Sequence, residues 1–202
     1  ILREHSLTLN IHELIEQSIR LHGTNIDNKD ATSEVSTYIN ERLRGMLIEE
    51  GISPAMVIAV GMVNPATLTD FEKRIAAVTA FSELAEADNL AAANKRIHNI
   101  LKKTSDTVPD STDKALFESE EESNLYAKVE QKETELKPLV DACDYKAILI
   151  SLAELKDPID AFFDHVMVMT DNEQVRQNRL SLLQRVYQLF IKVADVSVLQ
   201  DS

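Results

Sequence analysis

Hydrophobic residues recur at intervals of three and four through nearly the whole chain, which is the spacing of amphipathic helices rather than of strands. Four glycines and five prolines in 202 residues leave little turn chemistry for a many-stranded sheet. The pattern therefore predicts an all-α protein, a helical bundle. We expect its helices at about 11–21, 33–50, 53–63, 70–84, 90–103, 144–156 and 172–194, with a short one inside "DPIDAFFDHVMVM".

Residues with known roles at helix ends divide these segments from one another. Gly23 and Gly51 follow two apolar-periodic runs, where glycine ends helices in the left-handed conformation. Ser53 is expected as an N-cap with Pro54 at the first helical position, where the missing N–H costs nothing. Thr69 is expected to cap the helix that begins with "DFEKRIAAVTAFSEL".

One predicted helix, which contains "NKRIHNILKK" at 94–103, has a strongly basic face. At about 100° per residue, an apolar side separates from a cationic one. The apolar side holds Leu90, Ala93, Ile97, Ile100 and Leu101, and the other holds Lys95, Arg96, Asn99, Lys102 and Lys103. A solvated helix face is the ordinary explanation of such a pattern, and a site for a polyanion is the alternative.

The net charge of −13 is distributed unevenly along the chain. Residues 67–103 contain six basic and five acidic side chains, whereas residues 104–144 contain four basic and twelve acidic ones. We expect this acidic arm to face solvent. Because salt screens charges beyond about 8–10 Å, an acidic arm elsewhere does not prevent an anionic partner from approaching the basic face.

Catalytic and metal-binding motifs are absent from the sequence. The five histidines have no HxxH or HExxH spacing, and the isolated glycines form no phosphate-binding loop. The single Cys143 is expected to be buried and inert, and it fits a reducing, cytoplasmic setting. No apolar run reaches the length of about 18 residues that a membrane span needs. Because the chain begins at Ile1, we expect a fragment of a longer protein. Because these motifs are absent, we expect this fragment to have no catalytic residue, metal or cofactor of its own.

The last predicted helix contains a charged residue on its apolar face. Arg179 falls in the same sector as Val175, Leu182, Leu183 and Val186. A buried guanidinium needs a carboxylate partner, because its uncompensated desolvation costs several kcal/mol. We expect a structural ion pair with Asp160 or Asp164 on the preceding short helix. Met167 and Met169 are expected to fill gaps in the core.

Several segments together resemble the C-terminal part of the β subunit of bacterial tetrameric glycyl-tRNA synthetase. They are "INERLRGMLIEEG", "DFEKRIAAVTAFSEL", "LAAANKRIHNILKK" and "DPIDAFFDHVMVMTDNEQVRQNRLSLLQRVYQLFIKVADVSVLQ", in the order of that family. The basic helix and "VRQNRLSLL" are also similar to the helical anticodon-binding domain of arginyl-tRNA synthetases.

The resemblance implies a helical connector at 1–63 and an anticodon-binding-like domain at 64–202. It implies an α subunit as partner, which carries the class II active site and uses ATP and Mg²⁺ to attach glycine to tRNA-Gly. Two α and two β subunits would form the holoenzyme, with no membrane or DNA involved.

The resemblance also implies contacts with the anticodon arm of tRNA. The basic face, Lys95, Arg96, Asn99, Lys102 and Lys103, is expected to meet phosphates, which carry no sequence information. Arg176, Tyr187 and the amides of Asn99 and Asn178 are candidates for contacts with unstacked bases. Two alternatives stay open: the anticodon domain of an arginyl-type enzyme, and a non-catalytic helical scaffold that binds proteins.

Overall fold

The computed structural model describes residues 9–22, 28, 30–105 and 107–201. The described residues form α-helices and short 3₁₀ turns, with one isolated bridge between Asn10 and Thr67, so the all-α prediction is confirmed. The α-helices are α1 (Ile11–His22), α2 (Ala31–Glu49), α3 (Pro54–Gly61), α4 (Leu68–Ser82), α5 (Ala87–Lys103), α6 (Glu120–Asp141), α7 (Tyr145–Leu152), α8 (Lys156–His165) and α9 (Glu173–Ile191). The 3₁₀ turns are η2 (Lys114–Leu116), η3 (Ala153–Leu155) and η4 (Val196–Asp201).

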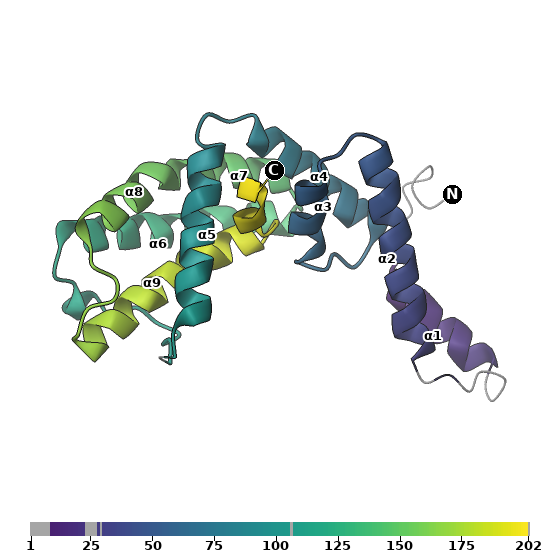
Figure 1. Ribbon diagram of the computed structural model, residues 1–202, viewed down its shortest axis with the longest axis horizontal. Helices are drawn as coiled ribbons and strands as arrows, with labels where there is room; N and C mark the ends of the chain where they lie inside the picture. Colours follow the sequence, from purple (N-terminus) through teal and green to yellow (C-terminus); the bar gives the residue numbers. More distant parts are fainter. Residues whose placement is uncertain (1–8, 23–27, 29, 106, 202) are drawn as a thin grey trace.

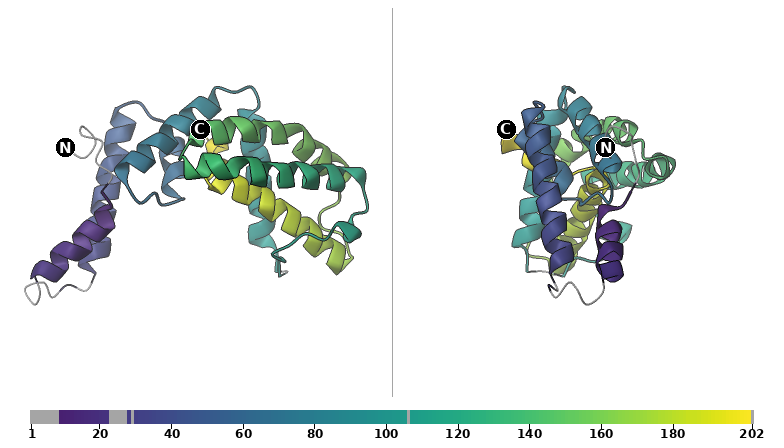
Figure 2. Two further views of the ribbon diagram at one scale, coloured as in Figure 1. Left: turned by 180° about the vertical axis from the view of Figure 1, so that it is seen from behind. Right: turned by 90° about the vertical axis from the view of Figure 1, so that its right-hand side faces the viewer.

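Helices α1 and α2 form a hairpin that projects from the rest of the molecule (Figure 1). The hairpin is thinly packed, since α1 buries none of its residues and α2 buries only Leu43 and Leu47. The remaining helices form a bundle in which α6 packs against α7, α8 and α9 (Figure 2). Helix α5 crosses α9 on the opposite side of the bundle from α6 (Figure 1).

The C-terminal segment after α9 connects α9 with α3, α4 and α5. After α9, the turn η4 packs on both α3 and α5, and the backbone N–H of Asp195 donates to the carbonyl of Ala59 at 3.0 Å. Arg74 of α4 donates to the carbonyls of Lys192 and Val193, each at 2.8 Å, and so neutralises the negative end of α9. Helix α3 is therefore fastened to the bundle, although it precedes residue 63; the domain boundary at residue 63 stays a prediction.

The helix ends follow the expected chemistry with one correction. Gly51 has a φ of +93°, and the N–H groups of Gly51 and Ile52 donate to Ile48 and Leu47, which is the Schellman arrangement after α2. Ser53 and Pro54 occupy the predicted positions at the start of α3, but the Ser53 side chain makes no capping hydrogen bond. The prediction of Thr69 as a cap is wrong: Thr67 accepts the N–H of Asp70 at 3.1 Å, and α4 begins two residues earlier than expected. Gly23 lies outside the described residues.

Cys143 is exposed, so the prediction of a buried cysteine is wrong. It follows α6 with a φ of +53°, and its N–H donates to the carbonyl of Val140 while that of Asp144 donates to Leu139. This is the same arrangement that glycine makes after α2. The cysteine therefore occupies a turn on the surface, a position decided by the backbone rather than by the side chain.

Candidate nucleic-acid interface

The basic face of α5 is directed outward, as the helical spacing predicted. Its opposite side is fully buried at Leu90 and Ile97. Asn99, Lys102 and Lys103 are exposed, and Lys95 is half-buried. The exposed Arg96 has its guanidinium 4.0 Å above the centre of the Phe163 ring of α8, a cation–π contact that fixes its direction.

A shallow groove of about 540 Å³ runs along this face between α5 and the C-terminal turn. Its described lining residues are three basic side chains, with four uncharged ones and no acidic one: Lys95, Arg96, Lys103, Ala92, Asn99, Ile100 and Gln200. Lys102 and Lys103 also lie in the last turn of α5, where cations offset the helix dipole. That stabilisation is about 0.3–1 kcal/mol and does not account for Lys95 or Arg96, which lie further from the end.

Tyr187 lies between α5 and α9 and is engaged in structural contacts. Its hydroxyl donates to Asp195 Oδ2 at 2.7 Å and lies 3.1 Å from His98 Nδ1, and its ring lies 5.6 Å from the His98 ring. Burial raises the pKa of Tyr187, and the hydrogen bond to Asp195 raises it further. The residue connects α5, α9 and the C-terminal segment, a role that does not require contact with a base.

Two further candidates for base contacts are engaged by the protein backbone. Asn178 is buried, and its amide accepts from the N–H of Asp113 at 2.7 Å and donates to the carbonyl of the same residue at 2.9 Å. Arg176 donates to the carbonyl of Thr170 at 2.7 Å and holds the loop before α9. Asn178 is therefore unsuited to the readout predicted for it, because its side chain binds the backbone of Asp113 to α9.

Arg179 is a buried ion-pair residue, as the sequence indicated, but its predicted partners are wrong. The guanidinium binds Glu122 and Glu118 of the segment that begins α6, with Nε 2.8 Å from Glu122 Oε1 and Nη2 2.8 Å from Glu118 Oε2. Asp160 instead pairs with Lys156 at 3.0 Å, and Asp164 is exposed on α8. The error arose because Asp160 and Asp164 are near in the chain, whereas α6 passes α9 only after folding.

The acidic arm is not simply a solvated face. Its carboxylates form ion pairs: Glu133 with Arg185 of α9, Glu130 with Lys114 of η2, and Glu135 with Lys132 of the same helix. Lys132 is fully buried and also binds Glu154 at 2.9 Å and Ser151 at 2.8 Å. Part of the negative charge of α6 therefore holds the bundle together.

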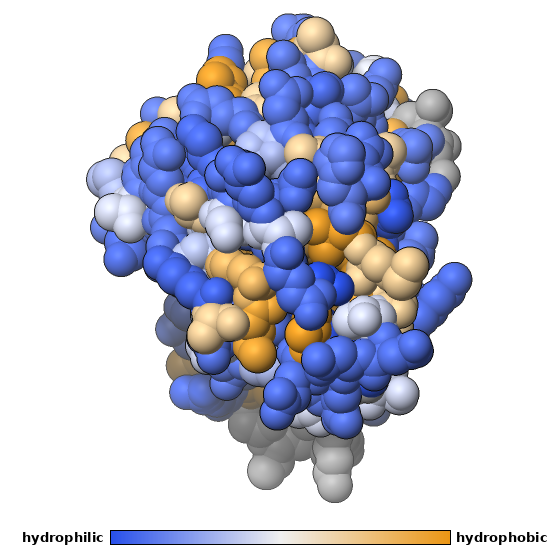
Figure 3. All heavy atoms as spheres, turned by 90° about the vertical axis from the view of Figure 1, so that its left-hand side faces the viewer, coloured by the Kyte–Doolittle hydropathy of each residue, from blue (hydrophilic) through white to orange (hydrophobic). Residues whose placement is uncertain are grey.

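Met167 and Met169 are exposed, at 73% and 54%, so the prediction that they fill the core is wrong. Val166 and Val168 are buried instead: α8 ends at His165, Val166 has an extended backbone, and buried and exposed side chains alternate from Val166 to Met169. Figure 3 looks onto this end of the molecule and shows apolar surface in the lower half of the face, surrounded by hydrophilic residues.

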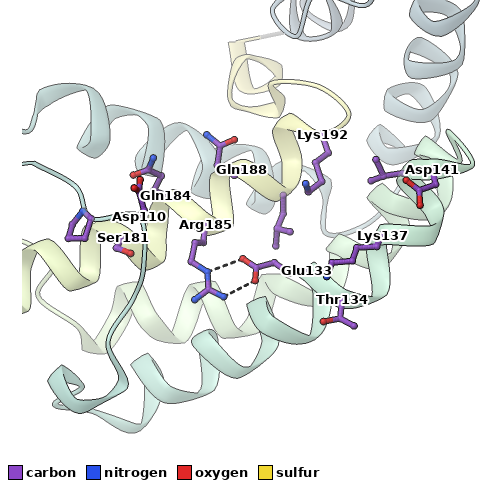
Figure 4. Close-up of a pocket in the computed structure, with 13 residues that line it drawn as sticks. Asp110, Glu133, Thr134, Lys137, Asp141, Ser181, Gln184, Arg185, Gln188 and Lys192 are labelled. Carbon is purple, nitrogen blue, oxygen red and sulfur yellow. Dashed lines mark hydrogen bonds and ion pairs between the residues drawn. The ribbon is translucent and has the colours of Figure 1, made fainter.

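A second groove, of about 690 Å³, lies between α6 and α9 and was not predicted from the sequence (Figure 4). Arg185 of α9 points across it and forms a bidentate ion pair with Glu133 of α6, with Nε 2.9 Å from Oε1 and Nη2 2.8 Å from Oε2. Hydrogen bonding to Glu133 outweighs burial and raises the pKa of Arg185. Gln184 and Gln188, four residues apart on α9, also line the groove, and this spacing is the signal that sequence reasoning missed.

Metal and membrane sites are not found in the described part of the chain. Within those residues, no group of three or more histidine, cysteine or acidic side chains is placed to hold a metal ion. None of the described helices has both the length and the apolar character that crossing a membrane requires.

Comparison with known proteins gives a consistent result. The family model of the DALR anticodon binding domain matches residues 90–196, from the basic helix to the start of η4. Glycine–tRNA ligase β subunits are similar over 99% of the chain: those of Aeromonas salmonicida (strain A449) and Pectobacterium atrosepticum are 40% and 42% identical over 200 residues. That of Pseudomonas entomophila is 37% identical over 199 residues. The chain spans 29% of the length of each of these relatives.

Proposed function

The chain belongs to the DALR anticodon binding domain family, and from this membership we propose that it is the tRNA-binding part of a glycine–tRNA ligase β subunit. It would hold the anticodon arm of tRNA-Gly while an α subunit attaches glycine in an ATP-dependent reaction in the cytoplasm. The similarity along almost the whole chain to β subunits of this enzyme supports the proposal.

The observation that carries the proposal is the cationic groove along α5. Its described lining includes three basic side chains and no carboxylate, in a protein with a net charge of −13. A surface of this kind suits phosphates, which bind lysine and arginine without regard to sequence. Lys95, Arg96, Lys102 and Lys103 would contact the phosphates of the arm, and Asn99 would add a hydrogen bond.

The phosphate contacts alone do not distinguish a glycyl from an arginyl-type domain, because both would bind a tRNA backbone. The relatives described above are glycine–tRNA ligase β subunits, which favours the glycyl assignment. A helical scaffold that binds only protein has less support, because it would not require a cationic groove in so acidic a chain.

Titration of the chain with tRNA-Gly, tRNA-Arg and an unrelated tRNA tests the proposal. We expect the tightest binding to tRNA-Gly, and no glycine-dependent pyrophosphate exchange by the chain until an α subunit is added. Preference for tRNA-Arg would favour the arginyl-type alternative. Binding to the α subunit without binding to any tRNA would favour the scaffold.

A further inference from the structure

The groove between α6 and α9 differs chemically from the basic face of α5. It offers hydrogen-bond donors and acceptors together: the amides of Gln184 and Gln188, the carboxylates of Asp110 and Asp141, and the ammonium groups of Lys137 and Lys192. Its volume of about 690 Å³ lies within the usual range of ligand sites, about 300–1,000 Å³. Such a mixture suits the edges of nucleobases, which present donors and acceptors side by side, better than it suits phosphates alone.

The side chains that line this groove are held in place before any ligand binds. Arg185 is fixed by its two hydrogen bonds to Glu133, and its guanidinium lies 4.7 Å from the centre of the Tyr126 ring. A guanidinium plane held in this way is a surface on which an unstacked base can lie. The rim is also fixed, because Thr112 and Ser181 share a hydrogen bond of 2.9 Å beside the Asn178–Asp113 contacts.

The groove also lies within reach of a molecule bound to the basic face. Pro109 and Asp110, which follow α5 in the chain, form part of the lining of the groove. Pro109 is six positions after Lys103 in the sequence, and so short a chain spans at most about 22 Å. The C-terminal end of the basic face therefore lies within about 22 Å of this edge of the groove.

We propose that the α6–α9 groove receives unpaired bases of the RNA loop whose phosphates bind α5, with Gln184 and Gln188 as the residues that determine base specificity. This inference rests on the proposed function. Arg185 supplies the stacking plane, and Lys137 and Lys192 hold the phosphates on either side of the bound bases. Glutamine side chains read base edges by paired hydrogen bonds, which the exposed lysines of α5 cannot do.

The test uses the 202-residue chain with Gln184→Ala and Gln188→Ala combined, and transcribed tRNA-Gly with or without single substitutions in the anticodon loop. The matched control removes two glutamine amides elsewhere, at Gln131 of α6 and Gln174 of α9, both exposed. We expect the groove variant to lose at least about fivefold of its preference for the unsubstituted loop, since each paired contact contributes that much or more. The salt dependence of its tRNA affinity and its thermal unfolding midpoint should match those of the control.

The failure of this inference can be told apart from the failure of the proposed function. If the wild-type chain binds no tRNA, both are wrong. If it binds tRNA-Gly and the groove variant keeps the full preference for its loop, only the groove assignment is overturned. Loss of α-subunit binding with an unchanged loop preference would make the groove a protein-docking surface and would also overturn the assignment.

Discussion

Arg179 and Glu122, 57 residues apart in sequence, form a buried ion pair with Nε 2.8 Å from Oε1. Their side chains are only 6% and 1% exposed. The same carboxylate accepts the N–H groups of Glu118 and Ser119, so it completes the capping box at the start of α6. Arg179 also donates to the carbonyl of Met167. One buried pair thus joins α9 to α6 and to the loop after α8.

Arg179→Ala should strongly destabilise the protein. Glu122 would stay buried without a cation, and removing one member of such a pair costs about 3–5 kcal/mol. Urea denaturation measures the loss, with Arg20→Ala as the control, because the Arg20–Glu16 pair is exposed and contributes about 0–1 kcal/mol. An unchanged midpoint together with lost tRNA binding would show that Arg179 contacts RNA and is not structural.

A second substitution tests whether Arg179→Ala loses stability because the Glu122 carboxylate is left buried without a cation. Glu122→Gln removes the charge and keeps an oxygen that can accept the capping N–H groups. We therefore expect the double variant Arg179→Ala/Glu122→Gln to be more stable than Arg179→Ala alone. If the two are equally unstable, lost packing rather than the buried carboxylate explains the effect.

Lys132→Met should cost much less than Arg179→Ala, although Lys132 is equally buried. Its carboxylate partners Glu135 and Glu154 are 41% and 59% exposed, so water can solvate them once the cation is removed. Methionine also fills a similar volume. We expect a loss within the range of about 0–1 kcal/mol seen for exposed pairs, measured by the same denaturation. A loss as large as that of Arg179→Ala would contradict this explanation.

Tyr187→Phe should reduce the sensitivity of stability to alkaline pH. The folded state raises the pKa of Tyr187 above its ordinary value of 10.0, so its stabilising contribution is complete below about pH 10 and is lost as pH rises further. At neutral pH the variant is less stable, because buried Asp195 loses a donor. The difference in unfolding free energy between wild type and variant should therefore narrow above about pH 10. If the difference in unfolding free energy between wild type and variant stays constant as pH rises above about 10, the pKa of Tyr187 is not raised.

Periodicity identified the helices and the basic face because both depend on neighbours in the sequence. Ile97 and Lys103 fell on the sides of α5 that the spacing assigned to them. The partners of Arg179 could not be obtained this way, since Glu122 meets it only when α6 packs along α9. Met167 and Met169 are predicted to fill the core because methionine is apolar and adaptable, but they lie beyond the end of α8, where Val166 and Val168 take the buried positions.

Of the candidate site, only the basic face of α5 could be predicted, because it depends on residues that are neighbours in the sequence. The lysines of α5 form a local pattern, whereas the α6–α9 groove combines residues from two helices with Pro109 and Asp110. Asn178 is predicted as a base contact for its amide, and Tyr187 for its aromatic ring near the margin of the apolar stripe of α9. Their hydrogen bonds with Asp113 and Asp195 depend on tertiary contacts that the sequence pattern does not reveal.

The most direct test of the tRNA-binding role is the salt dependence of affinity for tRNA-Gly. The variant combines Lys102→Ala and Lys103→Ala, both exposed on α5, and the control combines Lys73→Ala and Lys146→Ala, exposed on α4 and α7. Each lost phosphate contact should reduce the slope of log K against log salt by about 0.7–0.9. We expect weaker binding of every tRNA and a slope smaller by about 1.4–1.8 for the α5 variant, with the control unchanged. An affinity and slope equal to those of the wild type, or an equal change in the control, would contradict the assignment of α5 as the phosphate-binding surface.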